Sequence, residues 1–414
     1  MSAVEQVAVA IVGGGPSGLT AAANLAQAVD GPVLVLERER HTGGIPRHSD
    51  HPGFGIRDLH RFVSGPAYAR RLTEAAVVAG AVLETEAQVT GWDGERRLLV
   101  TSPRGRRIVE AGAVVLATGA RERPRPARRI PGDRPEGVYT TGQLQNLVHL
   151  HHASVGTKAV VVGAELVSWS AVMTLREAGC STVAMLTPYA RSEAYRAFVG
   201  VGKAVLRTPV LARHRLVHIN GRARVESVVV ENLDTGLRST IACDAVVTTG
   251  DWIPDHELAR IAGLSMDAGT LGPVVDGSLR TSRSGVFAIG NLVHPVDTAD
   301  VAALDGRHVV SSVVEYLGGG ATSAESQISV CAGEPFAWVS PQRMAPGEPT
   351  ARGHILLWAS DFNDRPVVQA WQRDKLIGER RALRSVAPGR VFRVPRSLVD
   401  GAVVGDGPVT ITLA

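Results

Sequence analysis

Three glycines near the N-terminus have the spacing of a phosphate-binding turn. Gly13, Gly15 and Gly18 stand between the apolar run VAVAIV and the alanine-rich stretch LTAAANLAQA. In a G-x-G-x-x-G turn the first glycine permits a tight bend, the second lets the backbone approach a pyrophosphate, and the third lets helix and strand pack closely. The N-terminus of the following helix then binds the anion. The pattern predicts a dinucleotide-binding site.

An acidic residue stands at the distance that a ribose requires. The apolar run PVLVL ends at Glu37, 24 residues after Gly13, and Arg38 follows it. In dinucleotide-binding folds an acid about 20 residues downstream accepts hydrogen bonds from the ribose. The strand, the glycine turn, the helix and the acid together make this prediction specific, because the glycines alone are a weak signal.

Two later segments read as strands of the same sheet. AGAVVLATG ends at Thr118 and Gly119, and SGVFAIGN ends at Gly290 and Asn291 before a helical stretch. Here the chain resembles the flavoproteins with two dinucleotide-binding domains, the group that includes thioredoxin reductase and glutathione reductase. The resemblance implies FAD, with the late segment beside the ribityl chain and the flavin pyrimidine. Asn291 stands where the group usually has Asp, and it can hydrogen-bond a ribityl hydroxyl without bringing a charge.

Three further motifs narrow the resemblance. GGIPRH at 43–48, HPGFG at 51–55 and TTGQLQ at 140–145 resemble the FAD-containing alpha-type subunits of opine oxidase, hydrogen cyanide synthase, and dye-linked proline and hydroxyproline dehydrogenases. They also resemble the oxidoreductases that accompany glycerol-3-phosphate dehydrogenase. The likeness spans roughly residues 5 to 325. Some relatives carry Cys where this chain has Ser49, so the departure removes thiol chemistry beside the flavin.

The resemblance implies a set of residues that contact FAD. They come from the glycine turn, the end of the second strand, the GGIPRH segment and the ends of the later strands, together with Val89. The set is Gly13, Gly15, Pro16, Ser17, Gly18, Glu37, Arg38, Gly44, Ile45, Pro46, His48, Val89, Ala117, Thr118, Gly119, Gly290, Asn291, Thr298 and Ala299.

The expected fold class is α/β with a small all-β domain at the C-terminus. Two Rossmann-like, doubly wound parallel sheets are predicted from the alternation of apolar strands and helical stretches. The FAD domain is expected at 1–122 and 266–325, with an NAD(P)-like domain inserted at 123–265. After a flexible linker, GGGATSAE, short β-type runs predict a β domain at 331–414. We expect its tryptophans, Trp338, Trp358 and Trp371, to pack in its core.

The second nucleotide fold has a degenerate glycine turn. After the run KAVVV come Gly163, then Glu165 in place of the second glycine and Ser168 in place of the third. The position of the ribose acid is taken by Thr187, and only Arg191 is nearby as a candidate for a 2′-phosphate. A carboxylate in the pyrophosphate path repels a bound diphosphate. We therefore expect no productive NAD(P) binding, whereas a structural role, or a purine nucleotide bound without hydride transfer, stays open.

Three histidines are candidates for chemistry at the flavin. The chain after Glu37 reaches the flavin ring within a dozen residues at about 3.3 Å per residue, which brings His48 and His51 close. His294 follows Gly290 and Asn291. Each could act as a general base or hold negative charge on the flavin, and Asp50 could orient either of the first two. Equally, each could simply hydrogen-bond backbone or ribityl groups.

Composition excludes several classes of protein. With 44% hydrophobic and 20% charged residues, the chain is of the soluble globular type, and we expect a cytoplasmic location and no membrane span. The three cysteines have no C-x-x-C or metal-type spacing, which argues against a redox dithiol, a cysteine-bound cluster and a metal site. The net charge is only +4. We interpret the arginine run RERPRPARR at 121–129 as a solvated linker rather than a nucleic-acid site.

The expected function is that of an FAD-dependent oxidoreductase in a heteromeric complex. We interpret the chain as the alpha-type subunit of a multi-component dehydrogenase or oxidase for an amine, an amino acid or a glycerol-3-phosphate-type substrate. Its partner is expected to be a second flavoprotein or an iron–sulfur subunit, docked on the β domain. Two alternatives stay open, a self-contained NAD(P)H-dependent flavin reductase and a non-catalytic assembly subunit stabilised by FAD.

Overall fold

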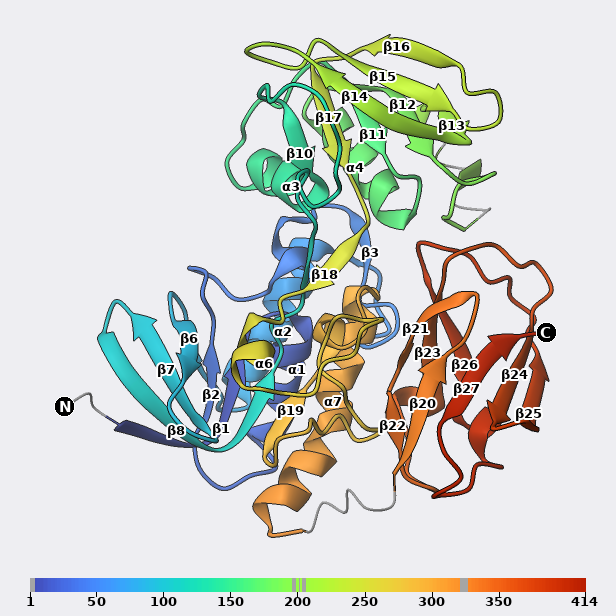
Figure 1. Cartoon of the computed structure of the whole chain (residues 1–414). Coiled ribbons are helices and arrows are strands. Elements are labelled where there is room, and N and C mark those ends of the chain that lie inside the picture. Colours follow the sequence, from blue (N-terminus) through green and yellow to red (C-terminus); the bar gives the residue numbers. More distant parts are fainter. Residues whose placement is uncertain (1–3, 196–198, 201, 203–205, 321–326) are drawn as a thin grey trace. The chain divides into compact units, whose positions relative to one another are not determined.

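The computed structural model describes residues 4–195, 199–200, 202, 206–320 and 327–414. Figure 1 shows the whole chain. The chain divides into two compact units, which are described separately. Unit 1 comprises Met1–Arg47, Gly53–Ala120 and Ile253–Ala414, and unit 2 comprises His48–Pro52 and Arg121–Trp252. Residues 321–325 of the predicted linker GGGATSAE lie outside the described residues.

Unit 1 contains a seven-stranded sheet in which the first strand, β1, lies centrally. The order is β5-β2-β1-β8-β7-β6, and β19 also pairs with β8. The pairs among β1, β2, β5, β8 and β19 are parallel, whereas β6, β7 and β8 pair antiparallel. The strands are β1 Val4–Val12, β2 Val33–Leu36, β5 Val82–Glu84, β6 Gln88–Trp92, β7 Arg97–Ser102, β8 Gly105–Leu116 and β19 Val286–Ala288.

Helices and short elements of the first unit connect these strands. They are α1 Pro16–Leu25, η1 Ile45–His48, β3 Pro52–Phe54, β4 Val63–Ser64, α2 Gly65–Val78, α6 Glu257–Ile261, η2 Gly290–Leu292 and α7 Ala299–Leu317. The last residue of η1, His48, and the first residue of β3, Pro52, are part of unit 2. The chain passes between the two units at β9 Ala120–Glu122 and β18 Trp252–Pro254.

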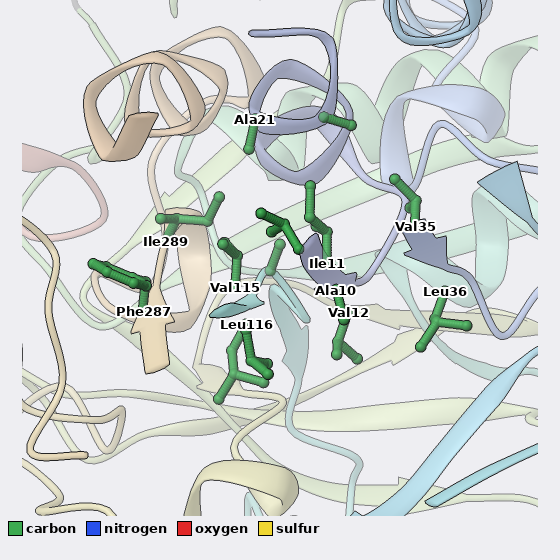
Figure 2. Close-up of a cluster of buried hydrophobic side chains, with 14 of the residues drawn as sticks. Ala10, Ile11, Val12, Ala21, Val35, Leu36, Val115, Leu116, Phe287 and Ile289 are labelled. Atoms are coloured by element: carbon green, nitrogen blue, oxygen red, sulfur yellow. The ribbon is translucent and has the colours of Figure 1, made fainter. Parts of the chain in front are cut away.

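The core of this domain is built by the apolar C-terminal parts of its central strands. Val9, Ala10 and Ile11 of β1 are completely buried, as are Val114, Val115 and Leu116 of β8. Figure 2 shows these strands meeting β2, β19 and helix α1 in one hydrophobic cluster. Runs without polar alternation are typical of a parallel sheet that is covered on both faces, so the predicted fold class is confirmed for this domain.

Unit 2 repeats the parallel arrangement. Its five-stranded sheet has the order β10-β17-β11-β12-β13, and all of these pairs are parallel. A three-stranded antiparallel sheet, β14-β15-β16, follows. The elements are β10 Val138–Thr140, α3 Thr141–His149, β11 Lys158–Val162, α4 Leu166–Glu177, β12 Ser181–Thr187, β13 Val210–Ala212, β14 His214–Asn220, β15 Ser227–Asn232, β16 Arg238–Ala242 and β17 Ala245–Thr248.

The C-terminal part of unit 1 is all-β, as predicted. It contains a five-stranded sheet, β22-β20-β27-β24-β25, and a three-stranded sheet, β21-β23-β26. The elements are β20 Ile328–Ala332, β21 Phe336–Ser340, β22 Arg343–Met344, η4 Ala351–Gly353, β23 His354–Ala359, β24 Val367–Gln372, β25 Lys375–Arg381, β26 Val391–Pro395, η5 Arg396–Val399 and β27 Val409–Leu413. We call residues 328–414 the β domain.

The tryptophans of the β domain differ from the simple expectation. Trp338 is buried, whereas Trp358 and Trp371 are half-buried. Trp338 and Trp358 stack with their ring centroids 5.9 Å apart, and with Leu356 and Val391 they form an apolar cluster separate from the main core of the domain. This pair therefore packs outside the core.

Two other expectations need correction. Residues 253–265 fold with unit 1 rather than unit 2, because α6 packs there and Leu258 O accepts a hydrogen bond from Trp92 Nε1 at 3.0 Å. The arginine run is not simply solvated. Arg125 is buried and donates to three backbone carbonyls, and Arg128 donates to the carbonyls of Arg123, Thr249 and Gly250. These arginines supply hydrogen-bond donors to the carbonyls of the loops around them.

No helix within the described ranges is long and apolar enough to cross a membrane. Among the same residues, no group of three or more His, Cys, Asp or Glu side chains is arranged to hold a metal ion.

Candidate functional site

The three glycines of the turn in unit 1 differ in their surroundings. Gly13 has a φ of +108°, and a Cβ there would lie 2.5 Å from Ala117 O. A Cβ on Gly18 would lie 2.0 Å from Gly13 O, so this glycine lets α1 pack against the turn. Gly15 differs, because its added Cβ would meet nothing within 4 Å. Its φ of −81° is open to any residue. No packing contact therefore requires a glycine at position 15, and the space beside it is open.

Glu37 is fixed by the turn that it follows. One carboxylate oxygen accepts from Gly14 N at 2.8 Å and the other from Glu39 N at 2.8 Å. The side chain is buried, and each oxygen keeps a second lone pair for a ribose hydroxyl. Arg38 points elsewhere, since it pairs with Asp255 at 3.1 Å and is largely exposed.

Asp255 also holds the end of β8, which the sequence did not indicate. Its carbonyl accepts from Thr118 Oγ1 at 2.7 Å, and its N–H donates to Gly119 O at 2.9 Å. Ala117, just before, donates to Val12 O at 2.8 Å. The ends of β1 and β8 are thereby held together beside the glycine turn.

The late segment converges on the start of α1. A Cβ on Gly290 would lie 2.6 Å from Ser17 Oγ, and one on Gly306 would lie 2.3 Å from Ser17 O. Pro16 occupies the first turn of α1, where a proline is well tolerated. Segments that are distant in the sequence therefore meet at one helix N-terminus, where the phosphate of a dinucleotide can bind.

Asn291 closes a short loop on itself. Its Nδ2 donates to Asp297 O at 3.1 Å, and its Oδ1 accepts from Asp297 N at 3.0 Å. Asp297 in turn accepts from Thr298 N at 2.8 Å. Thr298 is the N-cap of α7, which begins at Ala299. We call residues 291–297 the flavin loop, because the family resemblance places Asn291 beside the ribityl chain.

His294 lies in this loop and is almost completely buried. Its Nε2 lies 2.6 Å from Asp305 Oδ2, and the same oxygen accepts from Gly290 N at 3.1 Å. The carboxylate fixes the tautomer with the proton on Nε2. Nδ1 has no hydrogen-bond partner among the described residues. This arrangement orients His294 and links it to the backbone at Gly290, but it supplies no paired acid and base.

The remaining predicted contacts of unit 1 surround the same turn. Gly44 has a φ of +59°, and a Cβ there would lie 3.0 Å from Gly15 Cα. Pro46 is buried and Ile45 is exposed. Val89 is buried on β6, two residues after Ala87, whose N–H donates to Glu37 O.

A buried polar network near α7 was missed by sequence reasoning. Tyr68 donates to Asp58 at 2.5 Å, and Arg57 donates to Asp300 from its backbone and its side chain. Burial raises the pKa of Asp58 and of Tyr68. No motif marks this network, because its members become neighbours only when the chain folds. It anchors the segment after the HPGFG motif to the start of α7.

The residues of this site fit FAD. The open cradle at Gly15 suits a pyrophosphate, the fixed carboxylate of Glu37 suits a ribose, and the loop at Asn291 presents an amide where a ribityl hydroxyl is expected. When bound, FAD supplies the hydride and electron chemistry that these side chains lack. The chain itself binds and orients the group.

His48 and His51, the other predicted catalytic residues, fold with unit 2, whereas His294 belongs to unit 1. His48 O accepts from His149 Nδ1 at 2.6 Å. His51 Nδ1 lies 2.9 Å from Pro52 O and its Nε2 lies 2.7 Å from Ser170 Oγ. Since a carbonyl only accepts, Nδ1 carries the proton and Nε2 accepts. Burial lowers the pKa of His51, which favours this neutral form.

Ser49, where some relatives carry Cys, is bonded within unit 2. Its hydroxyl donates to Gln145 Oε1 at 3.1 Å, and Gln145 Nε2 donates to Ser170 Oγ at 2.7 Å. These contacts join Ser49, which follows the GGIPRH motif, to the TTGQLQ segment and to α4 through buried polar side chains.

The second glycine turn is filled by its own side chains. Glu165 has a φ of −82° and a ψ of −174° at the N-cap of α4. It is buried, and its Oε2 accepts from Ser168 Oγ at 2.7 Å. Ser168 Oγ also lies 2.7 Å from Thr249 Oγ1. The carboxylate thus stands at the helix terminus where a pyrophosphate would bind.

Two more buried acids accompany Glu165. Burial, with a contribution from the Glu165 charge, raises the pKa of Glu193 to about 8 and that of Glu122 to about 7. Glu193 accepts from Thr187 Oγ1 at 3.1 Å, so the place of a ribose acid is engaged within the protein. Sequence reasoning found Glu165 but not its companions, which come from distant segments.

The three cysteines do not form a redox pair. Cys180, Cys243 and Cys331 are all free thiols. Burial raises the pKa of Cys180 and Cys243 to about 11, which disfavours the reactive thiolate.

Comparison with known proteins agrees with this geometry. The family described as pyridine nucleotide-disulphide oxidoreductase matches residues 7–306. The chain is 27% identical over 346 residues to one subunit of the opine oxidase of Rhizobium meliloti, covering 75% of this chain and 63% of that protein. It is 28% identical over 324 residues to thioredoxin reductase of Treponema pallidum (strain Nichols), covering 75% of this chain and 97% of that protein.

A solved structure shows the same fold. The crystal structure of T. acidophilum thioredoxin reductase aligns with a TM-score of 0.64 at 20% identity, covering 75% of this chain and 98% of that one. The predicted resemblance and the predicted cofactor are therefore confirmed. The chain belongs to the pyridine nucleotide-disulphide oxidoreductase family and is an FAD-dependent oxidoreductase.

Proposed function

We propose that the chain is the alpha-type flavoprotein subunit of a multi-component dehydrogenase or oxidase. Its substrate class would be an amine, an amino acid or a glycerol-3-phosphate-type compound, oxidised with a partner protein. The observation that carries the proposal is the buried Glu165 carboxylate in the second glycine turn. A chain that cannot bind NAD(P)H productively must receive its electrons from another donor.

Two further observations support a partner. The matched relative from Rhizobium meliloti is named as one subunit of an oxidase. The three cysteines are free thiols, and we propose that electrons pass between this flavin and a second flavin or an iron–sulfur centre on another polypeptide. We propose FAD contacts through the cradle and loop residues described above, with His294 as an orienting group.

A self-contained NAD(P)H-dependent flavin reductase is the second candidate. It is favoured by the match to a thioredoxin reductase over 97% of that protein. The fold is compatible with this function, but the buried Glu165 carboxylate in the second glycine turn argues against NAD(P)H binding. A third function, that of an assembly component whose FAD only stabilises the fold, predicts a flavin that does not turn over within the complex.

Co-expression with the proteins encoded beside it tests the proposal. The complex should be reduced at its FAD by one compound of the proposed classes, whereas the isolated chain should not respond. The matched control is the complex reconstituted with Gly15→Glu, which should assemble without this flavin. A partner-free chain that reduces its flavin with such a substrate would contradict the proposed role.

A further inference from the structure

The three-stranded sheet β21-β23-β26 has two different faces. Ile355 and Leu357 of β23 belong to the core of the β domain, as do Phe392 and Val394 of β26. The residues between them point to the other side, because side chains alternate along a strand. Arg393 is one of these outward residues. It pairs in register with Leu356, a member of the separate cluster that contains the two stacked tryptophans.

Arg393 reaches from this outer face to the flavin loop. Its guanidinium forms an ion pair with Asp297, and the Asp297 side chain is only 7% exposed. Asp297 is also the residue whose backbone makes both hydrogen bonds to the Asn291 amide. A residue 96 positions downstream of Asp297 therefore holds the loop that presents Asn291.

Other contacts keep the β domain in place against the same part of unit 1. Gln342 Oε1 accepts from Val275 N at 3.1 Å, and Glu348 accepts from Arg280 Nη1 at 3.2 Å. A Cβ on Gly269 would lie 2.6 Å from Ala337 O, next to Trp338. Arg393 is thus delivered by a fixed sheet rather than by a free side chain on a loop.

We propose that the β domain completes the FAD site and that Arg393 is its positioning residue, acting through Asp297 on Asn291. The family match ends at residue 306, so this contribution comes from a part of the chain outside the matched region. The inference concerns FAD binding alone and holds whichever partner supplies the electrons.

The ion pair has two physical consequences. Removing one partner of a buried pair leaves an uncompensated charge, which is strongly unfavourable. In Arg393→Ala the Asp297 carboxylate must turn toward water, and the loop that holds Asn291 moves with it. Any negative charge that stays beside the flavin opposes the uptake of electrons, because like charges repel. FAD should therefore bind more weakly, and its midpoint potential should fall.

The test uses the FAD-loaded full-length protein and measures two quantities, the rate of FAD release by flavin fluorescence and the midpoint potential by anaerobic redox titration. We expect Arg393→Ala to release FAD about tenfold faster and to have a lower potential. Arg393→Lys, which keeps the charge, should recover most of the potential. The matched control is Arg373→Ala, which removes an exposed arginine of the same domain and should behave as wild type.

A neutral replacement of Asp297 provides a second, independent test of the ion pair. Asp297→Asn leaves the Arg393 charge unbalanced, so the potential of this variant should rise. The double variant Asp297→Asn with Arg393→Ala should return toward the wild-type potential. The Asp297→Asn measurement stands if Arg393→Ala does not fold. Wild-type release rates and potentials in the folded single variants would overturn the proposal, while leaving FAD binding and the proposed function untouched.

Discussion

Gly15 and Glu165 occupy equivalent positions in two copies of one fold, and their backbones agree closely. Their φ angles are −81° and −82°, and both ψ angles are −174°. A side chain is therefore compatible with this backbone, and the glycine of unit 1 serves the ligand rather than the turn. In unit 2 Glu165 accepts from Ser168 at this position, and we propose that its carboxylate keeps a pyrophosphate out.

The comparison predicts the behaviour of Gly15→Glu. The variant should fold, since no atom lies within 4 Å of the added Cβ, but it should purify without FAD because the carboxylate occupies the pyrophosphate path. The flavin-to-protein absorbance ratio measures this. The control is Gly200→Glu in unit 2, an exposed glycine with the same open surroundings. A yellow Gly15→Glu protein with full occupancy would refute the site assignment.

At the level of secondary-structure elements, Glu165 at the start of α4 contributes to the raised pKa of two other buried acids. Between its ordinary value of 4.5 and its folded pKa of about 8, Glu193 holds a proton in the folded protein that the unfolded chain has lost. Folding stability must therefore fall as the pH rises through this window, by up to about 1.4 kcal/mol per pH unit. Glu122 adds a similar slope up to its pKa of about 7.

Glu193→Gln should remove the Glu193 part of this slope, since the amide does not titrate. Chemical denaturation of wild type and variant at about pH 5 and about pH 8 measures the difference. Glu136→Gln, an exposed substitution in the same unit, should leave the slope unchanged. An identical slope in Glu193→Gln would show that Glu193 does not carry the buried proton.

Strands and helices can be predicted from the local sequence pattern, whereas the contacts between distant segments cannot. The strands β1, β8 and β11 each end in an apolar run just before a glycine-containing turn, so sequence alone predicts them and their parallel sheets. The packing of residues 253–265 on unit 1 depends on a bond from Trp92 to a distant carbonyl. The carbonyl contacts of Arg128 arise in the same way. From sequence alone an arginine run is predicted to be solvated, because some of the loop carbonyls that its side chains contact come from distant segments.

For the whole molecule, the β domain changes the expected result of truncation. The sequence suggests an independent docking module whose removal leaves FAD in place. The bonds of Gln342, Glu348 and Arg393 to the FAD domain instead predict that deleting residues 331–414 loses FAD together with any partner. The FAD content of the truncated protein decides between these results. Full occupancy would show that the β domain is dispensable for the cofactor.

Anaerobic stopped-flow mixing of the FAD-loaded protein with NADH and with NADPH tests most directly whether the flavin takes electrons from a nicotinamide. Because Glu165 fills the second turn, the flavin should stay oxidised with both nucleotides over seconds, although dithionite should reduce it fully. Glu165→Gln serves as the comparison, since removing the charge while keeping the size should still leave the site blocked. Rapid bleaching of the wild-type flavin by either nucleotide would contradict the account and identify the protein as a self-contained reductase.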